Sequence, residues 1–326
     1  MTVAARAETE TTSQDIAPAT IVVGIDGEDG GREALALACR FAASSGGRIV
    51  AVCAYPALAA RHALLIWPRI SSRAEAAQAL AGAREQLADR PRSRFACVAG
   101  TTPGSVLQRV AAEHGADLVV IGSSRRAAIG QLLGGDVVGQ VLSHPTCAVA
   151  VALRGALDAE APLAHVGIAV DGTDQALRAV RWAGALTQPP FQARKLELIH
   201  VGADDTQPVV AGHAVVEHLA DEHRFEAYAA LGLVGRLGTS VLVTWTEAGG
   251  AVVPALAELE QRLDLLVLGT HGRGAFGRLL HGAVAREVAD CARCPVVVVP
   301  AALEDGQDEQ GEHADGDEHD HGSGRH

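Results

Sequence analysis

Short apolar runs recur along the chain, separated by longer segments in which apolar residues follow a helical spacing. Residues 265–268 read Leu-Leu-Val-Leu after an aspartate, and residues 295–299 read Pro-Val-Val-Val-Val. Charge-free runs of this length, bounded by glycine or proline, are typical of strands buried on both faces of a parallel sheet. The alternation of such strands with helical segments predicts an α/β fold with a doubly wound parallel sheet.

A first complete unit of this alternation spans residues 20–153. Gly46-Gly47 ends its first helix, and Pro68 lies at the start of its longest helix or in a loop before it. We expect strands at 20–27, 48–55, 94–99, 117–122 and 147–153, and helices at 30–43, 61–89, 104–114 and up to residue 142.

The pattern then restarts, and its landmarks keep a nearly fixed spacing. Three pairs lie 147 positions apart (269 − 122 = 147), and a fourth lies 145 apart (171 − 26 = 145), so two extra residues enter early in the second unit. Such a register indicates an internal repeat. The pairs are Asp26 and Asp171, Gly122 and Gly269, Gly135 and Gly282, and Cys147 and Cys294.

The repeat predicts two α/β domains joined by a short linker. In the second unit we expect a strand from residue 166, a helix at 214–231, a strand at 241–245 and a helix at 252–262. The predicted layout is a disordered lead at 1–19, domains at 20–153 and 163–301, a linker at 154–162 and a disordered acidic and His-rich tail at 302–326.

Charge and composition narrow the function classes. The net charge is −12, and the segment 303–326 carries nine acids and one Arg, which leaves −12 + 8 = −4 for the rest. With Lys195 as its one lysine, the chain has no basic footprint for nucleic acid. No apolar segment is long enough for a membrane span, and residues 1–20 lack the apolar block of a secretory signal. We expect a cytoplasmic protein with six reduced cysteines.

A glycine-rich turn follows the strand at 265–268. Gly269 and Gly272, with Gly282 further on, would let the backbone approach a phosphate, and the amino end of the next helix would add anion-binding amides. The carboxyl ends of strands are where open α/β sheets bind ligands. The spacing alone is weak evidence, and a purely structural role for glycines in a tight turn stays open.

Two other nucleotide-binding motifs fit poorly. Residues 272–277 match G-x-G-x-x-G, but they follow the penultimate strand of a unit rather than the first, and no acid closes the next strand. No G-K-[ST] occurs in the chain, which excludes a Walker loop. Neither flavin nor NAD is therefore expected.

Taken together, these residues resemble the universal stress protein family. The resemblance rests on strand-Asp-Gly, Asp-(apolar)4-Gly-Thr-His-Gly-Arg-Gly, Gly-Ala-Val-Ala-Arg-Glu-Val and Cys-Pro-Val-Val-Val-Val, and it is clearest in the second unit. It implies two tandem Rossmann-like domains, each with a five-stranded parallel sheet. It also implies, for the ATP-binding branch of the family, a nucleotide at the carboxyl ends of the strands.

Carried over to the second unit, the resemblance places Asp171 at the ribose or base. One departure is that Ala283 stands where the family pattern has Ser or Thr. It removes one hydroxyl donor, commonly worth about 0.5–1.5 kcal/mol, and weakens ATP binding without excluding it. The other positions implied are Val201 at the base and Gly269, His271, Gly272, Arg273 and Gly282 around the phosphates.

The first unit departs further from the family pattern. Asp26 and Gly122 are retained, but Arg125 replaces the second glycine and Asp136 follows Gly135. We expect this degenerate site to bind ATP poorly or not at all, and to bind another anion or serve as a pseudo-dimer partner.

Other candidate sites carry less weight. Asp26 and Asp171 are read either as functional acids or as residues that fix a strand-end turn, and no catalytic constellation is visible. Cys291-x-x-Cys294 lies between a helix and a strand, which is the wrong place for a thioredoxin-type site. The histidines of the tail are read as solvated rather than metal-binding.

The resulting hypothesis is a stress-response or regulatory protein that binds ATP, with Mg, in its second domain. ATP hydrolysis, if present, is expected to be slow. The alternative is a nucleotide-free dimerisation or interaction module of the same fold. An internal pseudo-dimer is expected in either case, and a homodimer of chains is left open.

Overall fold

The computed structural model describes most of both predicted units. It covers residues 18–57, 70–123, 137–143, 145–153, 162–171, 173–187, 191, 193–202, 242–270, 287–289 and 292–300. The expected lead, linker and tail lie almost entirely outside these residues, as does the expected helix at 214–231.

In the first half, five strands alternate with four helices among the described residues. All five strands are parallel to their neighbours, in the order β3-β2-β1-β4-β5. The strands are β1 (Thr20–Gly24), β2 (Arg48–Pro56), β3 (Arg94–Gly100), β4 (Leu118–Gly122) and β5 (Ala148–Ala152); the helices are α1 (Asp29–Ser45), α2 (Arg73–Gln86), α3 (Pro103–His114) and α4 (Val137–Ser143).

The second half repeats this arrangement. Its strands are again mutually parallel, in the order β10-β9-β6-β7-β8. The strands are β6 (His165–Ala169), β7 (Lys195–Gly202), β8 (Leu242–Gly249), β9 (Leu265–Gly269) and β10 (Val296–Val299); the helices are α5 (Asp174–Ala185), α7 (Val252–Leu259) and a 3-10 turn, η5 (Glu260–Arg262).

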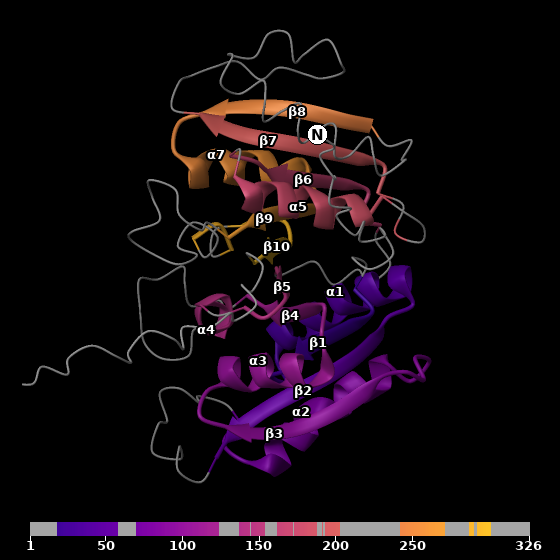
Figure 1. Ribbon diagram of the computed structural model, residues 1–326. Helices are drawn as coiled ribbons and strands as arrows, with labels where there is room; N and C mark the ends of the chain where they lie inside the picture. The colour runs from indigo at the N-terminus through magenta and orange to yellow at the C-terminus, as the bar shows by residue number, and fades with distance from the viewer. Residues whose placement is uncertain are drawn as a thin grey trace, which may run out of the picture.

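The two five-stranded sheets are joined edge to edge, which the sequence did not predict. The last strand of each half, β5 and β10, pair antiparallel with Val149 opposite Val298. The result is one ten-stranded mixed sheet that runs through the whole molecule, with β3 and β8 at its ends (Figure 1). The predicted internal pairing of the halves is thus made through a shared sheet.

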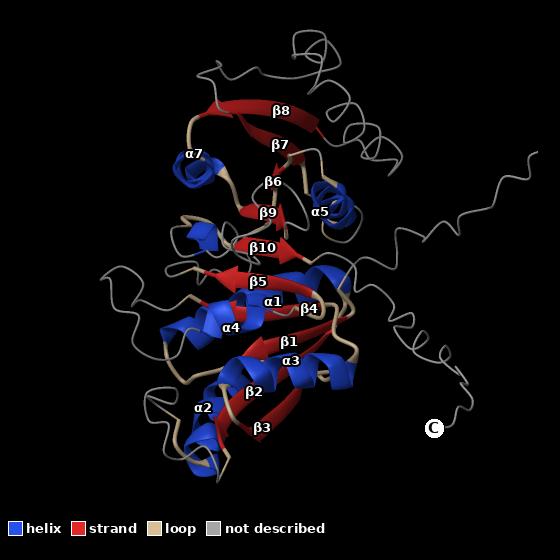
Figure 2. Cartoon of the chain, turned by 60° about the vertical axis from the view of Figure 1, so that its left-hand side comes forward, coloured by secondary structure: helices blue, strands red, loops and turns tan. Residues whose placement is uncertain are grey.

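Helices cover both faces of this sheet (Figure 2). Along β1, Ile21 and Val23 enter the core beneath α1, α2 and α5, whereas Val22 enters the core beneath α3, α4 and α7. Each of these valines and isoleucines is fully buried. The charge-free runs are therefore buried on both faces, as predicted.

Aromatic side chains join the two halves on the α1 and α5 side. Phe41 of α1 packs edge-on against Trp182 of α5, with ring centroids 6.0 Å apart, and against Phe191 at 6.3 Å. The guanidinium of Arg40 donates to the carbonyl of Pro162 at 3.3 Å. The two halves thus share one continuous core on this face.

Several predicted boundaries need correction. Residues 61–69 of the helix expected at 61–89 lie outside the described residues. Within the described part, α2 runs from Arg73 to Gln86, because Ser72 has extended backbone and its hydroxyl accepts from the Glu75 amide. The strand expected at 241–245 continues to Gly249, since it pairs with β7 along its length. Gly46 ends α1 in the left-handed region with φ of 64°, as expected.

No helix among the residues that the structure describes is long and apolar enough to cross a membrane.

Candidate functional site

The described residues of the predicted site lie at the carboxyl ends of neighbouring strands in the second half. Asp171 follows the end of β6, Val201 lies near the end of β7, and Gly269 ends β9. Because β6 lies between β7 and β9 and is parallel to both, their carboxyl ends share an edge. The structure therefore brings these three positions together. In the first half, Asp26 and Gly122 are related in the same way through β1 and β4.

The strand-end aspartates hold the first turn of the following helix. The Asp26 Oδ1 atom accepts from the amides of Glu28 at 2.9 Å and Gly31 at 3.0 Å. The side chain of Glu28, the N-cap of α1, makes no capping hydrogen bond to the helix. Asp26 thus satisfies an amide that the start of a helix leaves unpaired.

Asp171 also holds the first turn of the following helix, but it does so through Thr173. Its Oδ1 atom accepts from the amide of Thr173 at 3.2 Å and from the Thr173 hydroxyl at 2.6 Å. The Thr173 hydroxyl oxygen in turn accepts from the Ala176 amide and caps α5. The turn-fixing interpretation therefore holds for both aspartates, and it does not exclude a further contact to a ligand.

The strand-end glycines allow a helix to approach closely. A Cβ atom on Gly122 would lie 2.2 Å from the carbonyl oxygen of Gly30 in α1, and one on Gly269 would lie 2.6 Å from that of Gln175 in α5. A side chain cannot fit at either distance. We expected Gly269 to make room for a phosphate; what approaches it in the structure is the first turn of α5.

The amides that follow these glycines are already engaged. Thr270 donates to Val299 at 2.9 Å, and Ser123 donates to Ala152 at 2.9 Å, so each amide extends the sheet. Anion-binding amides in the second half would have to come from further along the turn. His271, Gly272, Arg273, Gly282 and Ala283 lie outside the described residues, as do Arg125, Gly135 and Asp136.

An open cleft of about 400 Å³ lies beside Asp26, between α1 and the exposed side of α2. Small residues of α2, Ala79 and Gly82, leave the space. Its charged lining consists of Asp26, Glu28, Glu75 and Arg32. The backbone amide of Ser71 and then its hydroxyl donate to Glu75 and hold the pKa of that carboxyl below its usual value. Three acids against one base make this cleft unfavourable for a triphosphate.

The described half of the C-x-x-C motif is a buried thiol. Cys294 is 4% exposed, and burial, followed by the charges of Glu260 and Asp264, raises its pKa far above the ordinary value. Glu260 itself is buried, and its Oε2 atom accepts from the Arg293 amide at 2.6 Å. Because only thiolates react readily, the raised pKa disfavours reaction at Cys294. Cys291 lies outside the described residues.

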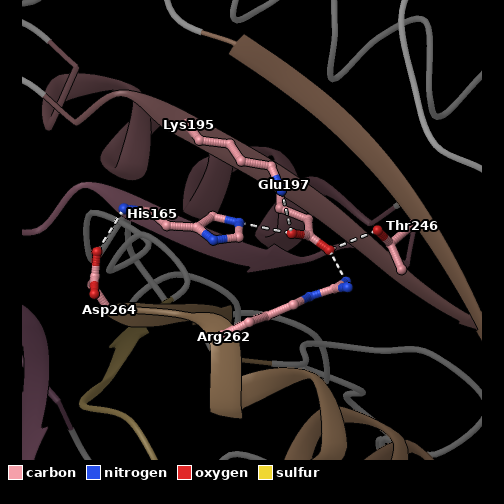
Figure 3. Close-up of polar contacts among 6 residues, drawn as sticks. All are labelled: His165, Lys195, Glu197, Thr246, Arg262 and Asp264. Carbon is pink, nitrogen blue, oxygen red and sulfur yellow. Dashed lines mark hydrogen bonds and ion pairs between the residues drawn. The ribbon is translucent and has the colours of Figure 1, made fainter.

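A buried polar cluster around Glu197 was missed by the sequence analysis (Figure 3). The Glu197 side chain is 1% exposed. Its carboxylate accepts from Lys195 at 3.1 Å, from Thr246 at 2.7 Å and from Arg262, and it lies 2.7 Å from the Nε2 atom of His165. Burial alone would raise the pKa of Glu197, but the bonds from Thr246 and Lys195 and the charge of Arg262 outweigh it and lower that pKa.

This cluster lies toward the amino ends of the strands, whereas Asp171 lies at their carboxyl ends. His165 and Lys195 begin β6 and β7, and the nearby Asp264 accepts from the His165 amide at 2.8 Å. The equivalent of Glu197 in the first half is Val50, two residues after the start of β2. A glutamate inside an apolar strand was the available signal. Among the described residues, no group of three or more His, Cys, Asp or Glu side chains could hold a metal ion.

Comparisons with known proteins agree with this fold. The model of the universal stress protein family matches residues 19–152 and again residues 163–300. A universal stress protein of Mycobacterium tuberculosis is 27% identical over 296 residues, which cover 85% of this chain and 96% of that protein. A universal stress protein of Thermus aquaticus is 31% identical over 139 residues, which cover 40% of this chain and 95% of that protein.

A solved structure shares the tandem fold. The crystal structure of a universal stress protein from Archaeoglobus fulgidus has a TM-score of 0.58 and 14% identity, and the match covers 87% of this chain and 96% of that chain. The match therefore extends over both halves of this chain. The chain belongs to the universal stress protein family, in a tandem form that carries the family domain twice.

Proposed function

We propose that this chain is a cytoplasmic stress-response or regulatory protein that binds ATP, with Mg²⁺, in its second half. The observation that carries the proposal is the meeting of Asp171, Val201 and Gly269 at the carboxyl edge of β6, β7 and β9. β6 and β9 are the strands between which the order of the sheet reverses, and α/β folds bind ligands at such switch points. The glycine turn that follows Gly269 would supply the phosphate contacts.

In this arrangement each group has a distinct task. The Asp171 carboxylate, already oriented by Thr173, accepts from a ribose hydroxyl. The turn after Gly269 would hold the phosphates, and a Mg²⁺ ion bound with them would neutralise part of their charge. No general base is assigned, so hydrolysis is expected to be slow. ATP acts by favouring the conformation or assembly that binds it more tightly.

We propose that the first half does not bind ATP. Its cleft beside Asp26 is lined by three carboxylates and one arginine, and its turn carries Arg125 and Asp136 where the family pattern differs. The first half therefore serves as the structural partner of the second.

Isothermal titration of Mg-ATP into the full chain tests the proposal. We expect one site per chain, no comparable heat with GTP, and loss of binding in Gly272→Arg. Asp171→Asn keeps an oxygen for the turn but loses the charge, and should weaken ATP binding about tenfold or more, because a hydrogen bond to a charged group contributes about 1.5–3 kcal/mol.

The matched control is Asp26→Asn in the first half. It makes the same chemical change at the equivalent turn and should leave ATP affinity unaltered. Equal losses in the two variants would place the nucleotide elsewhere or in both halves.

The alternative function is a nucleotide-free interaction module. The contact between Gly269 and the Gln175 carbonyl favours it, because packing alone then explains this glycine. Absence of heat and of any thermal shift at millimolar ATP, together with concentration-dependent self-association in sedimentation, would make this the better account.

A further inference from the structure

Two cysteines face each other on neighbouring strands of the first half. Cys53 of β2 is the register partner of Cys97 of β3. Adjacent strands lie about 4.8 Å apart, and the Cα atoms of disulfide-bonded cysteines are usually about 4.4–6.8 Å apart. The backbone therefore already holds the two residues at a separation that a disulfide accepts.

The two side chains lie on the same face of the sheet. Cys53 is fully buried in the core beneath α1 and α2, and Cys97 packs against the same core. Burial, and then the charges of Cys97 and Asp26, raise the pKa of the Cys53 thiol to about 12. The Cys97 side chain is thus close enough to contribute to the raised pKa of Cys53.

The pair differs in access and in freedom to move. Cys97 is partly exposed, whereas Cys53 is fully buried. β3 ends the strand order and pairs only with β2 among the strands that the structure describes. An oxidant therefore meets Cys97 first, and an edge strand can shift by the small amount needed to bring the sulfur atoms into bonding distance.

We propose that Cys53 and Cys97 form a reversible disulfide when the protein meets a hydroperoxide. The Cys97 thiolate attacks a peroxide oxygen, which breaks the O–O bond and leaves Cys97 as a sulfenic acid. With hydrogen peroxide the leaving group departs as water. The Cys53 sulfur then attacks the Cys97 sulfur and displaces a second water. Two thiols and one peroxide become one disulfide and two waters, and a thiol reductant reverses the change.

The position of this bond gives it a structural consequence. It ties the middle of the edge strand to β2, two residues before the pair Tyr55 and Ala99. The helix α2 packs over both strands through Leu80 and its neighbours and forms one wall of the acidic cleft. Oxidation therefore fixes the strands that support that wall. The inference does not depend on ATP binding in the other half.

The test is thiol mapping of the full chain after treatment with hydrogen peroxide. The protein is oxidised in its native state, its remaining thiols are alkylated in denaturant, and its peptides are analysed by mass spectrometry. We expect two of the six thiols to be lost, a cross-linked peptide that contains Cys53 and Cys97, and full recovery with dithiothreitol. The second step should accelerate as pH rises, because Cys53 must ionise to attack.

Three variants control the experiment. Cys97→Ser and Cys53→Ala should each abolish the cross-link while retaining a cooperative thermal transition. Cys147→Ser removes another partly exposed cysteine and should leave the cross-link intact. Recovery of Cys53 as a free thiol beside unreacted or over-oxidised Cys97, or pairing of Cys97 with another cysteine, would overturn the proposal.

Discussion

Gly122 and Gly269 lie where the first turn of a helix crosses the end of a strand. Motif reasoning assigned such glycines to phosphate binding, since a missing side chain lets a ligand approach the backbone. The structure provides a second reason, because the helix carbonyl occupies the same space. A glycine at this position is therefore expected in members of the fold with or without nucleotide.

Substitution of Gly269 by alanine should destabilise the fold. The new Cβ atom would lie 2.6 Å from the Gln175 carbonyl oxygen, so the backbone must shift, at a cost of about 1–3 kcal/mol. Urea unfolding measures the effect. The matched control is Gly82→Ala in α2, where the added atom meets nothing within 4 Å and should stabilise the helix by about 0.5–1 kcal/mol. Similar effects of the two changes would contradict the steric argument.

Among elements, the Glu197 cluster connects parts of the second half that are distant in sequence. One carboxylate on β7 holds Thr246 of β8, Arg262 of η5 and His165 of β6. The first half fills the equivalent position with Val50 and packs it in the core. The two halves therefore stabilise the same position by different means, one polar and one apolar.

Glu197→Gln should destabilise the protein at neutral pH by about 2–4 kcal/mol, since breaking a buried ion pair commonly costs about 3–5 kcal/mol and three of the partners here can reach water. The folded pKa of Glu197 is lowered, so its contribution is present above the unfolded pKa and is lost as pH falls through the folded value. Urea unfolding from pH 7 to pH 3.5 should thus show the difference from wild type shrinking with acid.

Thr246→Val is the milder comparison for this cluster. It removes one neutral donor and should cost about 1 kcal/mol, with a weaker pH dependence. A constant difference between Glu197→Gln and wild type across this range would show that the charge of Glu197 does not stabilise the fold.

At the scale of the whole molecule, the shared sheet and the aromatic contacts make the two halves interdependent. Phe41 is fully buried between the halves. We expect Phe41→Ala to cost about 3–5 kcal/mol and to separate the unfolding of the halves, because it removes the contact to Trp182. Calorimetry should then resolve two transitions where the wild type has one. A single transition that merely shifts to lower temperature would indicate that the β5–β10 pairing and the remaining core contacts suffice to couple the halves.

The local pattern of the sequence predicted the strands and helices of the first half and most strands of the second. The helix expected at 214–231 lies outside the described residues. Buried strands are recognised as charge-free runs, and the repeat is recognised from landmarks 147 positions apart. Both signals consist of residue types and their positions in the sequence, so neither requires knowledge of spatial contacts. Element ends were less well predicted. The α2 helix begins after Ser72, which caps it; this signal is local, but the helical composition of the preceding residues obscures it. The β8 strand is longer than expected because it pairs with β7, which is a contact between distant parts of the chain.

The sequence by itself determined the α/β class, the duplication, and the equivalence of Asp26 and Asp171 as strand-end residues of the two halves. Only the tertiary structure decided that β5 and β10 join the halves, that Gly269 faces a helix carbonyl, and that Cys53 lies opposite Cys97. Each of these depends on which strands become neighbours and in which register. Apolar periodicity states that a strand is buried, but it does not name the strand beside it, because many partners bury the same apolar surface equally well.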